Sequence, residues 1–237
     1  MRPEVDARTV ELCGLPGGGK SLIASSVAER LGARGLEVTL PLAAVAATQP
    51  LGRRVGTKVL IALREVARAP VDSVHAVVAI HRSGQSRRDL LHRSLNWLVV
   101  RGLYRQARRR PGIHVFDQGI VQEMCSIGYD GADWRACLPA SGPRFARLGP
   151  DVLIIVVTSV DTALARLDVR PGHQSRLERR DAVKRRAELE RQGCLLEQVE
   201  RAWFELHGRE LGTQRIEVGN EDGRLADAVE VVVAHAT

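Results

Sequence analysis

Residues 9–31, TVELCGLPGGGKSLIASSVAERL, hold the feature that most constrains how this chain can fold. Residues 9–13 are typical of a short buried strand, and apolar residues recur at helical spacing from residue 22 to residue 31. Between them, residues 14–21 match the pattern G-x-x-x-x-G-K-[ST] at every fixed position. Glycines there let successive backbone N–H groups surround a phosphate, and the helix N-terminus adds its positive dipole end. The stretch predicts a strand, a phosphate-binding loop and a helix.

Each position of this loop has an expected role in binding a nucleoside triphosphate. We expect Lys20 to reach the β- and γ-phosphates, and the Ser21 hydroxyl to ligate Mg²⁺. The predicted nucleotide-binding residues are Gly14, Pro16, Gly17, Gly18, Gly19, Lys20, Ser21 and Leu22. The alternative is a glycine-rich turn that binds nothing. The order of strand, loop and helix favours the nucleotide site.

Length and composition bound the remaining possibilities. A chain of 237 residues can bury a full core, and no linker divides it, so we predict one domain over residues 1–237. The net charge of +7 suits phosphorylated ligands and would also suit nucleic acid. Aromatic residues make up only 3%, which disfavours a platform for stacking single-stranded nucleic acid. Four cysteines without paired spacing, and no long apolar segment, predict a cytoplasmic protein that makes no membrane contact.

Strand-like and helix-like segments alternate along the chain. Further strands are expected at 36–40, 113–116, 151–157 and 214–218, with helices between them and a loop over residues 41–52. Such alternation predicts a parallel sheet covered on both faces. We therefore predict a three-layer α/β fold of the phosphate-loop type, with a five-stranded parallel sheet.

A second candidate site residue is Asp117, which follows the apolar strand at 113–116. Ligands of such folds bind at the carboxyl ends of the strands, so Asp117 is expected near Ser21 as a metal-organising acid or catalytic base. The alternative for an isolated aspartate after a strand is a turn residue or a helix cap. The next residue, Gln118, cannot accept a proton from water as a glutamate would. A guanine-reading N-K-x-D and a D-x-x-G switch after the second strand are also missing, which disfavours a GTPase and leaves phosphoryl transfer to a second substrate.

An arginine-rich segment follows the strand at 151–157. Arginines that close over a phosphoryl group stabilise its spreading negative charge and exclude water. We predict a lid over about residues 161–180 in which Arg166, Arg170 and Arg176 act on the phosphates. For Arg179 and Arg180 we favour ion pairs along a helix face.

The chain resembles the nucleoside and nucleotide kinase group of phosphate-loop proteins, and its layout is similar to that of thymidylate kinases. The resemblance rests on GLPGGGKS at 14–21, LEVTL at 36–40, VFDQG at 115–119, the segment 151–170 and RIEVGN at 215–220. It implies ATP and Mg²⁺ as cofactors, Lys20 and Ser21 at the phosphates and the metal, and Asp117 as the acid of the third strand.

Two residues depart from the thymidylate kinase pattern. Pro16 stands where those enzymes carry an acidic residue, and Gln118 replaces the arginine that grips the acceptor's phosphate. An amide suits a hydroxyl acceptor better than a phosphate. Candidate acceptor-binding residues, besides Gln118, are Arg82, Arg88, Trp97 and Arg101, although a tryptophan in this pattern is more often a core residue.

These observations predict an ATP- and Mg²⁺-dependent kinase that acts on a nucleotide, a nucleoside or another small metabolite with a hydroxyl group. Two alternatives stay open: a regulatory nucleotide-binding protein that acts through a protein or nucleic-acid partner, and a degenerate kinase that binds ATP without transfer. The missing switch signatures disfavour the regulatory class. The sequence leaves open whether ATP or GTP is the donor, and whether the protein forms a homodimer.

Overall fold

The computed structural model describes residues 6–46, 51–129, 132–138, 149–169 and 182–237. At its centre is a five-stranded sheet in the order β2-β3-β1-β4-β5, and every neighbouring pair of strands is parallel. The strands are β1 (Arg8–Gly14), β2 (Val38–Thr39), β3 (Ile113–Phe116), β4 (Val152–Val157) and β5 (Gln214–Gly219). The predicted three-layer α/β fold is confirmed.

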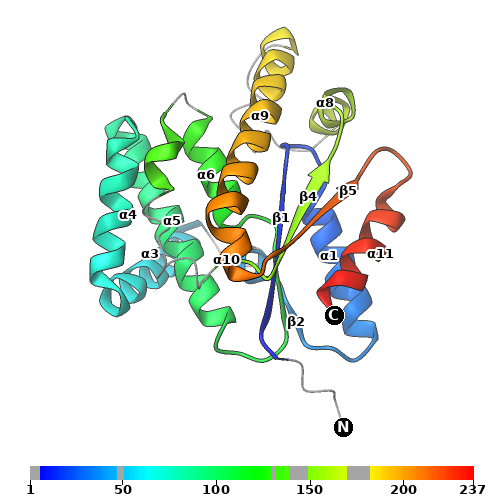
Figure 1. Ribbon diagram of the computed structural model, residues 1–237, viewed down its shortest axis with the longest axis horizontal. Helices are drawn as coiled ribbons and strands as arrows, with labels where there is room; N and C mark the ends of the chain where they lie inside the picture. Colours follow the sequence, from blue (N-terminus) through cyan, green and yellow to red (C-terminus); the bar gives the residue numbers. More distant parts are fainter. Residues whose placement is uncertain (1–5, 47–50, 130–131, 139–148, 170–181) are drawn as a thin grey trace.

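Helices α1 (Lys20–Ala33) and α11 (Leu225–Ala236) pack on one face of the sheet (Figure 1). Because side chains alternate along a strand, Val10 and Leu12 of β1 point into this layer. The intervening residues, Glu11 and Cys13, are also fully buried. They belong to the opposite face, which is why a charged residue of β1 lies inside the protein.

A larger helical layer covers that opposite face. It contains α3 (Leu51–Arg68), α4 (Pro70–Arg82), α5 (Arg87–Ala107), α6 (Ile120–Gly128) and α9 (Ala182–Trp203). Helix α5 is the centre of this layer, because it packs against α3, α4 and α6 and buries residues around most of its circumference. Tyr104 of α5 stacks on Phe116 of β3, with ring centroids 4.0 Å apart. This contact joins the helical layer to the sheet beside Asp117.

Three predictions of local structure are wrong or incomplete. Residues 41–46 form the short helix α2 (Pro41–Ala46) instead of a loop, because proline is well accommodated in a first turn and alanine favours helix. The apolar spacing predicts a helix over residues 89–110, but α5 begins at Arg87 and ends at Ala107. At the end of this helix the sequence predicts Arg108 as a solvated cap, but its guanidinium donates to Asp151 Oδ1 and to the Gly149 carbonyl, each at 2.7 Å.

Further short elements complete the described chain. These are the 3₁₀ helix η1 (Trp134–Cys137), helix α8 (Val160–Asp168), the π-helical turn η4 (Phe204–Gly208) and helix α10 (Arg209–Leu211). Within the described ranges, no helix is long and apolar enough to cross a membrane.

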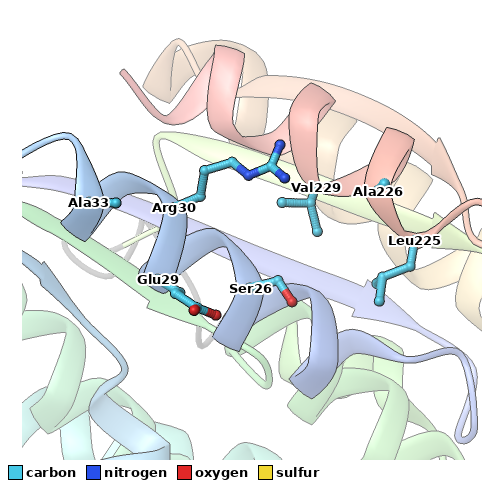
Figure 2. Close-up of a pocket in the computed structure, with 7 residues that line it drawn as sticks. All are labelled: Ser26, Glu29, Arg30, Ala33, Leu225, Ala226 and Val229. Carbon is cyan, nitrogen blue, oxygen red and sulfur yellow. The ribbon is translucent and has the colours of Figure 1, made fainter.

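A surface groove of about 460 Å³ runs between α1 and α11 (Figure 2). An ion pair between Arg30 and Glu230 joins the two helices. The residues that line the groove are Ser26, Glu29, Arg30, Ala33, Leu225, Ala226 and Val229. None of them was predicted as a site residue, and the groove lies on the face of the sheet opposite α5 and α6.

Candidate active site

The predicted phosphate loop connects β1 to α1, which begins at Lys20. Gly17 and Gly19 have positive φ angles of 81° and 82°, a conformation that favours glycine. Space also requires glycine at both positions: a Cβ at Gly17 would lie 2.5 Å from the Ala163 carbonyl oxygen, and one at Gly19 would lie 2.3 Å from Asn220 Nδ2. The loop is therefore enclosed by neighbouring segments that fix its curvature.

Lys20, Ser21 and Asp117 lie together at the carboxyl ends of β1 and β3. Lys20 Nζ donates to the carbonyl oxygens of Gly14 and Leu15, at 2.8 and 2.9 Å, so its ammonium group folds back across the loop. Ser21 Oγ donates to Asp117 Oδ2 at 2.6 Å, although 96 residues separate the two in sequence. This contact brings together the hydroxyl and the carboxylate that were predicted to share a metal ion.

The other side of the loop is supported by residues that follow β4 and β5. Asn220 Nδ2 donates to the Gly18 carbonyl oxygen at 2.8 Å. The N-terminus of α8 is tied to the segment after β5, because Ser159 N donates to Glu221 Oε1 at 2.6 Å. Hydrogen bonds from Thr162 and Ser159 lower the pKa of the Glu221 carboxyl, which therefore stays ionised at neutral pH. The start of the predicted lid is thus anchored beside the phosphate loop.

Arg166 lies on α8 at the edge of this loop. Its Nη2 donates to Asp222 Oδ1 at 3.2 Å, and a Cβ added to Gly19 would lie 3.7 Å from its Nη1. Nη1 is buried and has no hydrogen-bond partner among the described residues. A buried cationic donor beside a phosphate-type loop fits an anionic ligand. Arg170 and Arg176, like Arg179 and Arg180, lie outside the described residues.

The residues present fit a nucleoside triphosphate with Mg²⁺. The curved loop and the N-terminus of α1 face the same region. Arg166 supplies a hydrogen-bond donor at the edge of the loop, and Lys20 adds a positive charge. Mg²⁺ prefers oxygen ligands and keeps several waters, so one hydroxyl and one carboxylate, as in Ser21 and Asp117, form a suitable protein contribution. No cluster of three or more metal-ligating side chains occurs in the described ranges.

Glu11 is the least expected member of the site. It is fully buried in β1, and its Oε2 accepts from the Tyr104 hydroxyl at 2.8 Å. The backbone N–H groups of Ile120, Val121 and Gln122 also donate to its carboxyl. Burial outweighs these four donors and raises the pKa of Glu11 to about 7.

Gln122 extends this connection to the phosphate loop. Its Oε1 accepts from Gly14 N at 3.0 Å, and Gly14 is the first residue of the G-x-x-x-x-G-K-[ST] pattern. Glu11 therefore joins β1 to the start of α6, and Gln122 joins α6 back to the loop. Through these contacts the position of Asp117 is set relative to Lys20 and Ser21.

The candidate acceptor residues are not brought together. Gln118 is exposed beside Asp117, as its predicted role requires. Arg82 and Arg88 are exposed at the end of α4 and the start of α5, and in the described chain neither forms a hydrogen bond or ion pair with the phosphate loop or Asp117.

Trp97 and Arg101 are core residues. Trp97 is 2% exposed, which agrees with the alternative given for it above. Arg101 is fully buried and pairs with Glu65 of α3 at 3.1 Å and with Asp72 of α4 at 3.6 Å. Its guanidinium links three helices, so an acceptor role for Arg101 has no support in the structure.

A polar cluster between α3, α5 and α6 was missed by the sequence analysis. It consists of Lys58, Arg93, Asn96 and Glu123. Glu123 is 6% exposed, burial raises its pKa, and its Oε2 has no hydrogen-bond partner among the described residues. Lys58, whose pKa burial lowers, donates to Asn96 Oδ1 at 3.2 Å. The available signal was Glu123 itself, the one charged residue of α6, six residues after Asp117.

Comparison with known proteins supports the fold and assigns no specific activity. No protein-family model matches the chain, and no curated protein matches it. Among solved structures, the chain is similar to deoxyadenosine kinase from M. mycoides with the products dCMP and dCDP bound, at 13% identity and a TM-score of 0.52. That match covers 96% of this chain and 97% of the other. The same kinase with bound dATP matches at 12% identity and a TM-score of 0.51, covering 96% and 98%.

Proposed function

We propose that this protein is a small-molecule kinase that transfers the terminal phosphoryl group of ATP, held with Mg²⁺, to a hydroxyl-bearing acceptor. The observation that carries the proposal is the 2.6 Å contact between Ser21 of the phosphate loop and Asp117 at the end of β3. This contact supports a shared phosphate and metal site, because it joins a carboxylate to a hydroxyl of the loop. The likeness in fold to deoxyadenosine kinase, a protein that binds nucleotides, is consistent with this assignment.

Each residue of the site has a proposed task. Lys20 and the loop amides bind the phosphates, and Ser21 and Asp117 hold Mg²⁺, which when bound offsets the charge of the phosphates. Asp117 also orients the acceptor hydroxyl or accepts its proton. Arg166 neutralises charge on the transferred group, and Arg170 and Arg176 are proposed to close over it.

The proposed acceptor is a nucleoside, a nucleotide or a comparable metabolite. Gln118 would contact the acceptor next to its reacting hydroxyl. Glu123 adds a buried carboxyl six residues after Asp117, and Lys58 and Arg93 act on it electrostatically. A carboxyl beside cations can recognise a ligand that both donates and accepts hydrogen bonds, such as the edge of a nucleobase.

The test is acceptor-dependent release of ADP from ATP, measured over a panel of nucleosides, nucleoside monophosphates and hydroxyl metabolites. With an acceptor found, Asp117→Asn should lower kcat by about 10² to 10⁴-fold, the usual contribution of a general base. ATP affinity should change much less, because Lys20 and the loop amides remain.

Asp6→Asn is the matched control, since Asp6 is an exposed carboxylate ahead of β1. It should leave both quantities unchanged. Tight ATP binding without phosphorylated product from any acceptor would refute the transferase and favour the regulatory or degenerate alternatives. A cytoplasmic location stays a prediction from the sequence.

A further inference from the structure

Helix α6 begins three residues after Asp117, and its first three backbone N–H groups already have an acceptor. Glu11 Oε2 accepts from Ile120 N at 3.0 Å, and Oε1 accepts from Val121 N at 2.9 Å and from Gln122 N at 3.1 Å. The first N–H groups of a helix have no partner within the helix, and they attract anions. Here a carboxyl group of the protein itself satisfies them.

The Glu11 carboxyl is held in this position from several sides. The Tyr104 hydroxyl donates to Oε2 at 2.8 Å, and the side chain has no exposed surface. Gly119 covers it so closely that an added Cβ would lie 2.2 Å from Glu11 Cδ. The Glu11 carboxyl therefore occupies the place at the N–H groups of residues 120–122 that an anion would take.

We propose that this internal carboxyl makes the site selective for an acceptor whose reacting group is a neutral hydroxyl, and excludes one whose reacting group is a phosphate. The inference rests on the proposed transfer at Asp117. A phosphate acceptor would bring negative charge next to the Asp117 carboxylate, and Glu11 already occupies the N–H groups of residues 120–122 that could offset this charge. Gln118 adds no charge, but its amide can donate to a hydroxyl oxygen and accept from a hydroxyl proton.

Three cations on the neighbouring helices interact with other groups of the protein. Lys58 donates to Asn96, and both Lys58 and Arg93 act on the buried Glu123 carboxyl. Arg101 is held within the core by Glu65 and Asp72. These partners reduce the positive charge that the helical layer could offer to a phosphate.

The first experiment compares matched acceptors that differ only by a phosphate, namely deoxyadenosine with dAMP and thymidine with dTMP. ADP release is measured for each. We expect kcat/KM to be at least about 100-fold higher for the neutral member of any pair that is turned over, because placing like charges together is strongly unfavourable. Equal or faster turnover of the monophosphate would overturn the proposal.

The second experiment observes the helix end directly. The ¹H–¹⁵N resonances of Ile120, Val121 and Gln122 are followed during titration with inorganic phosphate, while Mg²⁺ and a non-hydrolysable ATP analogue occupy the phosphate loop. In the wild type these resonances should not shift, and saturable shifts would overturn the proposal. Glu11→Ala should gain the shifts, but the wild-type result decides even if that variant does not fold.

The two experiments separate this inference from the proposed function. Absence of turnover with every acceptor would refute the transferase, and acceptor selection with it. Saturable phosphate shifts at residues 120–122, or a preferred monophosphate, would overturn acceptor selection and leave the kinase standing.

Discussion

The buried carboxyl of Glu11 predicts an unusual pH dependence of stability. Burial raises its pKa from an ordinary value of 4.5 to about 7, so the folded protein binds this proton more tightly than the unfolded chain does. Below the unfolded pKa the group is protonated in both states. Between the two pKa values only the folded state retains the proton, so the free energy of unfolding falls as the pH rises through this window.

The size of the effect follows from the two pKa values. Each pKa unit corresponds to about 1.4 kcal/mol, so the difference between 4.5 and about 7 amounts to about 3 kcal/mol. This stabilisation is fully present below roughly pH 4.5 and lost by roughly pH 7. Most aspartates and glutamates behave in the opposite way, because ion pairs depress their pKa and their contribution is lost in acid.

The assay is urea unfolding of the wild type and of Glu11→Gln at a series of pH values. The difference in unfolding free energy between the two proteins removes the titration of every other carboxyl, including Glu123, whose pKa burial also raises. This difference should decrease by about 3 kcal/mol between roughly pH 4 and pH 8.

Tyr104→Phe gives a matched control. The Tyr104 hydroxyl donates to Glu11 and lowers its pKa, so removing it should extend the pH window upward. A wild-type minus Glu11→Gln difference that is flat with pH, or that grows as the pH rises, would refute the assignment of this titration to Glu11.

Three further predictions concern binding, packing and assembly. Lys20→Met should weaken ATP binding by about 10 to 100-fold, the worth of a charged hydrogen bond, and an unchanged dissociation constant in calorimetry would contradict the phosphate role. Arg101→Met should lower the free energy of unfolding by about 2 kcal/mol, the worth of a charged hydrogen bond, because Glu65 loses one buried partner and keeps Arg105. ATP affinity should remain unchanged, and a selective loss of acceptor affinity would instead restore the acceptor role of Arg101. Helix α3 exposes four apolar side chains along one side, those of Val55, Val59, Leu63 and Val66. Such a surface favours association, so sedimentation should show a homodimer, and Leu63→Glu should convert the dimer to a monomer. A monomeric wild type would contradict this prediction.

The features of the fold and of the candidate site that the sequence predicted well depend on local chemistry. The phosphate loop requires particular residues at fixed spacing, and the order of strands and helices follows from apolar periodicity over short windows. The position of Asp117 next to Ser21 was predictable as well, since carboxyl ends of parallel strands meet at one edge of the sheet. In each case the information lies within one segment or in a general property of the fold.

The acceptor side could not be predicted in this way, because it depends on how helices pack. Trp97 and Arg101 are four residues apart and share a face of α5, but that face points into the core, where Glu65 and Asp72 of other helices neutralise Arg101. Periodicity identifies a shared face and does not say what the face contacts. The same limit applies to Glu123, whose neighbours come from α3 and α5.

The sequence contained a signal for the role of Glu11, and that signal implied hydrogen-bond partners for its carboxyl. A glutamate within the buried run TVELC cannot remain without partners, because an unpaired buried carboxylate is very costly. The sequence therefore implied hydrogen-bond donors for Glu11 but could not identify them. The fold supplies these donors where β1 contacts the start of α6. The close approach there leaves space only for glycine at position 119. The residue that looked most out of place in the first strand thus joins the phosphate loop to the predicted catalytic acid.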